Sequence, residues 1–168
     1  MITSEYCQVM ADYNQWMNQK LYSICIDELG DGERKQDRGA FFGSIHGTLD
    51  HILLGDRLWL GRFLQQPFAG KIGRELYKDF PQLHQARIET DRQIITWTAE
   101  LTTSWLEQPL TYTSGIDQKV RTMPSWVLVT HFFNHQTHHR GQVTTLLSQL
   151  GYDLGTTDLP WLPRFLDK

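Results

Sequence analysis

Apolar side chains recur at helical spacing in four long stretches, so the sequence predicts a mainly α-helical protein. Pro81 and Pro124 stand where the third and fourth helices begin, and Gly30 and Gly151 follow the first and the last. The second stretch is apolar on more than one side, which predicts either broad burial or contact with another subunit. The predicted helices span residues 2–29, 40–64, 81–107 and 124–150.

The connections between these helices are unusually long. Residues 65–80 and 108–123 give sixteen residues each, whereas antiparallel neighbours in a bundle need only a few. We therefore expect at least one connection to cross the bundle. Within the second connection, residues 110–113 and 119–122 flank the pair Ser114-Gly115 and predict a small hairpin before the last helix.

The chain shows no repeat, no low-complexity tract and no flexible linker. We therefore predict one domain over residues 1–168, an all-α four-helix bundle with long crossover connections. The tail, residues 156–168, alternates prolines with large apolar side chains and should pack back as an extended strap.

Composition describes an ordinary globular protein, with 40% apolar and 21% charged residues. A net charge of −3, with both signs interleaved, argues against a nucleic acid or an anionic membrane as partner. No run approaches the length of a membrane span, and no basic region leads into an apolar one at the start, so we expect a cytoplasmic protein. Cys7 and Cys25 would lie about 27 Å apart on one helix, too far for a disulfide.

Four of the seven histidines fall within residues 131–139. Side chains four residues apart share a helical face, close enough for two imidazoles to bind one ion. His131 with His135, and His135 with His139, both satisfy this spacing. His135 and His139 also share a stripe with apolar side chains, where unpaired imidazoles would be costly.

His51 is the candidate third ligand. It lies eleven residues into its predicted helix, and His135 lies eleven residues into its own, so both reach a similar depth in the bundle. Small residues, Gly47 and Gly55, stand one turn away on either side of His51 and should leave a pocket beside an ion. On spacing alone, His131 competes for one of the three places, and a bundle whose histidines bind nothing remains an alternative.

Other polar and aromatic side chains are interpreted as structural. His138 fits equally well at the border of the pocket or at the surface, and Arg140 is expected to form an ion pair, with Asp56 as the candidate. We predict that six further side chains lie in the core, the histidines with hydrogen-bond partners there. They are His46, His84, His131, Tyr13, Trp16 and Trp59. Motifs of other metal sites, such as HExxH, CxxC or a repeated ExxH, are absent from the sequence.

Three segments carry a family resemblance: residues 13–18, 47–59 and 131–142. They resemble the signatures of the DinB family, the damage-inducible helical-bundle family that is distinct from the translesion polymerase of the same name. The resemblance spans essentially the whole chain. It implies a four-helix bundle, often a homodimer, with a divalent nickel or zinc ion on three histidines. By position, those ligands fall on His51, His135 and His139.

The resemblance also implies thiol chemistry, because the family includes transferases that use bacillithiol or related low-molecular-weight thiols and a mycothiol-dependent isomerase. This chain lacks the additional C-terminal domain that some thiol-dependent members carry, and many members have no known activity. The shared motifs identify the family and its metal rather than one reaction.

Three neutral imidazoles would leave a divalent ion with its full charge and an open position. A bound water has its pKa lowered to about 7, and a thiol, ordinarily near 8.5, would be deprotonated. We therefore expect a thiol S-transferase or hydrolase that acts on a small molecule through metal-bound water or thiolate. The alternative is a noncatalytic stress-response bundle with a structural ion.

Zinc or nickel is the expected ion, and iron or copper also suits imidazole ligands. The ring nitrogens that do not bind the ion need hydrogen-bond partners. The candidates are Asp50, Asn134, Gln142, Tyr13 and Asn14.

Overall fold

The computed structural model describes residues 2–166, and within them the fold is mainly helical with one small two-stranded sheet. The predicted helical class and the predicted hairpin are therefore confirmed. The long helices are α1 (Ser4–Asp27), α3 (Ile45–Phe63), α4 (Phe80–Glu100) and α6 (Ser125–Gln149). The shorter elements are α2 (Asp31–Lys35), α5 (Thr103–Glu107), β1 (Pro109–Thr113), β2 (Val120–Pro124) and the 3₁₀ turns η1 (Leu159–Trp161) and η2 (Pro163–Phe165).

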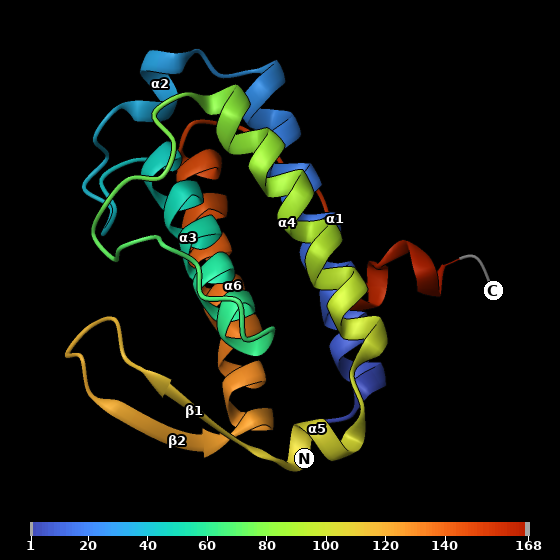
Figure 1. Ribbon diagram of the computed structural model, residues 1–168. Helices are drawn as coiled ribbons and strands as arrows, with labels where there is room; N and C mark the ends of the chain where they lie inside the picture. Colours follow the sequence, from blue (N-terminus) through green and yellow to red (C-terminus); the bar gives the residue numbers. More distant parts are fainter. Residues whose placement is uncertain (1, 167–168) are drawn as a thin grey trace.

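The long helices pack as two antiparallel pairs, α1 with α4 and α3 with α6, and the pairs meet through α3–α4 and α1–α6 contacts (Figure 1). Helices α3 and α4 run in the same direction, although they follow each other in the chain. Residues 64–79 must therefore travel back along the length of α3, as Figure 1 shows. This is the long crossing connection that the sequence predicts.

Three of the long helices begin where a polar side chain caps them. The side-chain oxygens of Thr3, Ser44 and Asp79 each accept a hydrogen bond from the backbone N–H three residues on. Because Ser44 is the cap, α3 begins at Ile45, and residues 40–44 form a loop rather than the predicted first turn of the helix.

The third predicted helix is wrong in one respect, since it is broken. Helix α4 ends at Glu100, Leu101 takes an extended conformation, and Thr102 accepts a hydrogen bond from the Trp105 backbone N–H to start α5. A threonine that caps a new turn competes with continuation of the helix before it.

Helix α3 is buried broadly, as its apolar pattern predicts. Its partners are α2, α4 and α6 of the same chain, so its burial needs no second subunit. The homodimer therefore stays a prediction. None of the helices within residues 2–166 is long and apolar enough to cross a membrane.

The tail packs back only in part. Leu162 is buried, but Trp161 and Phe165 are 54% and 42% exposed, and two 3₁₀ turns replace the predicted extended strap. An ion pair between Arg164 and Asp12 of α1 holds it against the helices. Residues 167–168 of the predicted strap lie outside the described part of the chain.

The two cysteines are buried and free, as predicted. Burial raises the pKa of Cys7 to about 11 and that of Cys25 to about 12. Because the thiolate is the nucleophile, we expect iodoacetamide at pH 8 to leave both cysteines of the native protein unmodified and to alkylate both in guanidinium. Mass spectrometry of the intact chain would measure this, and rapid alkylation of the native protein would contradict it.

Candidate metal centre

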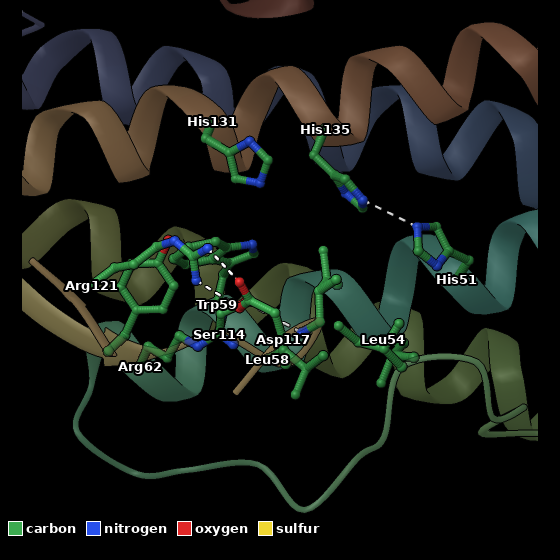
Figure 2. A pocket seen from close by; sticks show the side chains of 15 residues that line it. His51, Leu54, Leu58, Trp59, Arg62, Ser114, Asp117, Arg121, His131 and His135 are labelled. Atoms are coloured by element: carbon green, nitrogen blue, oxygen red, sulfur yellow. Dashed lines mark hydrogen bonds and ion pairs between the residues drawn. The ribbon is translucent and has the colours of Figure 1, made fainter. Parts of the chain in front are cut away.

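The structure brings together His51 of α3 and His135 and His139 of α6. Each can offer one ring nitrogen, and these atoms all lie within 4.8 Å of one another. Nε2 of His51 lies 3.1 Å from Nε2 of His135 (Figure 2). Two lone pairs at that distance repel each other unless a proton or a cation lies between them. A tetrahedral ion with bonds near 2.1 Å places its ligand nitrogens about 3.4 Å apart, so the trio fits a divalent ion.

Buried surroundings keep these imidazoles neutral. Burial, reinforced by the neighbouring His139, lowers the pKa of His51 to about 4. Burial and the surrounding histidines lower the pKa of His135 to about 3, and burial lowers that of His139 as well. All three rings therefore carry a free lone pair at neutral pH, which is the form that binds metal.

Gly55 makes room for His135 where α3 and α6 cross. A Cβ atom at position 55 would lie 2.7 Å from Cε1 of His135, closer than carbon atoms tolerate. The small residue that the sequence places one turn from His51 is thus needed for the ring of His135 to rest against α3.

Replacing Gly55 with alanine should weaken metal binding at the trio by about tenfold or more, because the imidazole of His135 must move away from the other two. Competition with a zinc chelator would measure the affinity. Gly141→Ala is the matched control, since a Cβ atom there meets nothing within 4 Å and α6 should only gain helix propensity. Equal affinities in the two variants would contradict the packing role of Gly55.

Gln142 fixes the orientation of His139. Nδ1 of His139 lies 2.7 Å from the Gln142 amide oxygen. An N–H donated from Nδ1 leaves Nε2 of His139 unprotonated toward the site. Gln142 is thus the predicted candidate that contacts the trio within the described chain.

The other candidate partners point elsewhere. Asp50 accepts backbone N–H groups from residues 76 and 77, and Tyr13 donates its hydroxyl to the Thr157 carbonyl. Asn14 donates to Asp91, and Asn134 is exposed.

Phe42 covers two of the three histidines, and the sequence pattern did not predict this. Its ring stacks on His51 with centroids 3.7 Å apart and meets His139 edge-on at 5.3 Å. Gly47 permits this approach, because a Cβ atom there would collide with the Phe42 carbonyl oxygen. Ser44 was the available signal, since a capping serine three residues before Gly47 places Phe42 in a loop rather than in the helix.

A cavity of about 460 Å³ opens beside His51 and His135, as the small residues on α3 predict. Its walls come from α3, α6, the β1–β2 hairpin and the connection between α3 and α4 (Figure 2). Its lining includes Leu54, Leu58, Trp59, Arg62, Tyr112 and His131. A small molecule can thus reach two of the three histidines, whereas His139 is buried.

The structure corrects the prediction that His131 is a core side chain and places Trp59 at the edge of the core, packed against it. His131 is exposed and lines the cavity, with its ring 5.9 Å from that of His135. Trp59 is half-buried and stands in the same wall, with its ring edge-on to that of His131. Both line the cavity between α3, α6 and the hairpin, so their position on an apolar stripe did not place them in the core.

The remaining histidines are mostly as predicted. His46 is a core histidine as predicted, with Nε2 2.7 Å from the Tyr77 carbonyl oxygen, but its buried Nδ1 has no hydrogen-bond partner within the described residues. His84 is half-buried and stacks on Tyr22, and His138 lies at the surface.

The predicted ion pair between Arg140 and Asp56 is wrong. Asp56 pairs with Arg87 of α4 at 2.5 Å, and Arg140 donates instead to the Asn14 amide oxygen. The competing partner comes from a helix whose position relative to α3 cannot be read from the spacing along α6.

Comparison with known proteins identifies the family of this chain. The sequence profile of the DinB family matches residues 1–165. Protein DinB of Bacillus subtilis (strain 168) is 28% identical over 162 residues, which cover 92% of each chain. The matched region includes both helices that carry the three histidines. This chain therefore belongs to the DinB family.

Proposed function

We propose that this protein is a four-helix bundle that holds one divalent ion, zinc or nickel, on His51, His135 and His139 and uses it as a thiol S-transferase or hydrolase. The observation that carries the proposal is that two neutral imidazoles of the trio stand in the wall of a 460 Å³ cavity. A structural zinc site is closed by four protein ligands, whereas the described residues supply a cluster of three.

An ion held there would supply the positive charge that lowers the pKa of a thiol or a water and so generates a nucleophile. The protein supplies orientation and exclusion of water. Gln142 holds the ring of His139, and Phe42 covers one face of His51. The apolar side of the cavity would then bind a small electrophile next to the site.

Activity assays of the zinc-loaded and nickel-loaded protein would test the proposal. One panel would combine low-molecular-weight thiols with halide and epoxide electrophiles, and another would contain activated esters and amides. Activity should require the metal and be lost in His51→Ala, while the surface variant His138→Ala should retain it.

Inactivity in both panels, with one ion bound per chain, would instead support the noncatalytic alternative, in which the ion stabilises the bundle. In that case, removing the ion should lower the melting temperature, and small anions should not perturb the spectrum of a cobalt-substituted site.

A further inference from the structure

Arg62 stands in the last turn of α3, at the wall of the cavity that reaches the trio. Its guanidinium lies over the ring of Trp59 at 4.4 Å and over the ring of Tyr112 at 5.0 Å. It also donates a hydrogen bond of 3.3 Å to the Thr113 carbonyl of the hairpin. Two aromatic faces and one carbonyl thus hold this cation in place, and they do not neutralise it.

The cavity offers Arg62 no free counter-ion. The acidic residue that lines the cavity, Asp117, already accepts two hydrogen bonds of 2.8 and 2.7 Å from Arg121. Within residues 2–166, no carboxylate comes within ion-pair distance of Arg62. Partial burial already lowers the pKa of Arg62, because desolvation disfavours its charge. An anionic ligand would compensate this cation.

Apolar side chains separate Arg62 from the trio. Figure 2 shows Arg62 at one end of the cavity and His51 at the other, with Leu58 and Trp59 between them. A volume of about 460 Å³ suits a ligand with an aromatic or branched apolar body. A molecule whose anionic end contacts Arg62 would therefore lay its apolar body on Trp59 and point its opposite end at the histidines.

We propose that this cavity binds small carboxylates with an aromatic or branched apolar body, and that Arg62 is the residue that selects the carboxylate. The proposal concerns substrate class and rests on the proposed function only for the reaction at the far end. Arg62, held between α3 and the hairpin, thus determines specificity at a distance from the three histidines.

Matched probes test it: 4-phenylbutyrate and the neutral 4-phenylbutanol, titrated calorimetrically into the full-length, zinc-treated protein. The carboxylate should bind about tenfold more tightly than the alcohol, the effect of one charge-assisted hydrogen bond. Arg62→Gln should remove this preference, and Arg62→Lys, which keeps the charge, should retain most of it. Arg92→Gln makes the same change of charge on the exposed face of α4 and should behave as the wild type.

The outcomes separate the possible sources of carboxylate binding. A preference that survives Arg62→Gln and disappears in His51→Ala would place the carboxylate on the ion and overturn the proposal. Equal binding of the two probes by the wild type, or no binding of either, would also overturn it. Because probe binding and zinc content are measured separately, a chain that binds no zinc could still show the Arg62-dependent preference, so the failure of one proposal leaves the other testable.

Discussion

Alanine at position 51 is expected to lower the affinity of the protein for zinc or nickel at least a hundredfold, enough to lose stoichiometric metal on dialysis. His51 supplies the α3 nitrogen of the trio, and without it only two imidazoles of α6 remain on one helical face. Elemental analysis would give the ions per chain, and chelator competition would give the affinity. A loss of metal affinity greater than a hundredfold exceeds the usual effect of removing a residue that only hydrogen-bonds to a metal-binding histidine.

Two matched variants identify the trio. His131 has the same spacing to His135 as His139 does, and His138 lies beside His139 with ring centroids 4.7 Å apart. Neither belongs to the cluster, so His131→Ala and His138→Ala should keep their metal. Metal retained in His51→Ala but lost in His131→Ala would show that the site lies nearer the N-terminal end of α6, inside the cavity.

The loss of metal in His51→Ala should also lower the stability of the protein. A ligand that binds only the native state at a hundred times its Kd stabilises that state by about 2.7 kcal/mol. Zinc should therefore raise the melting temperature of the wild type and of His138→Ala, and leave that of His51→Ala unchanged.

The helices and the shared face of His135 and His139 were open to prediction because both depend on local periodicity, whereas the choice of His51 rested on its depth in its own helix and on the family resemblance. A repeat of 3.6 residues places His135 and His139 on one face whatever the rest of the chain does. Likewise, Ser44 and Asp79 act as caps through hydrogen bonds to residues only three positions away. Such features follow from sequence neighbours, so a single sequence contains them.

The cavity was harder to predict because its walls come from segments distant in sequence. Tyr112 of the hairpin meets Trp59 of α3 with ring centroids 5.1 Å apart, and Arg62 stacks on both rings. Nothing in the spacing along α3 indicates that a hairpin fifty residues later covers that turn. For the same reason, Trp59 and His131 read as core residues, although they border open space.

Replacing Arg87 with methionine should destabilise the protein by about 3–5 kcal/mol, because it leaves two buried carboxylates without their cation. Arg87 is 2% exposed, and its guanidinium contacts Asp56 of α3 at 2.5 Å and Asp91 of α4 at 2.7 Å. Asp56 also accepts a hydrogen bond of 2.8 Å from Gln136, the neighbour of His135. These contacts thus join α3, α4 and α6 next to the candidate metal centre. Denaturant unfolding would measure the change.

Arg92→Met is the matched control, five residues further along α4, where the side chain is 72% exposed and pairs with Glu89. Its effect should stay within about 0.5 kcal/mol. The dependence on pH separates a charge effect from a packing defect. Burial raises the pKa of both Asp56 and Asp91 above the ordinary value near 4, so each binds its proton more tightly in the folded state. A raised pKa favours folding at low pH. Without Arg87, the amide donors Gln136, Asn14 and Asn18 and the charge of nearby Arg140 offset the carboxylate charges only in part. The loss of unfolding free energy in Arg87→Met should therefore become smaller as the pH falls from neutrality toward the raised carboxyl pKa values. A loss that does not depend on pH would mean that the substitution destabilises the protein through lost packing rather than through uncompensated charge.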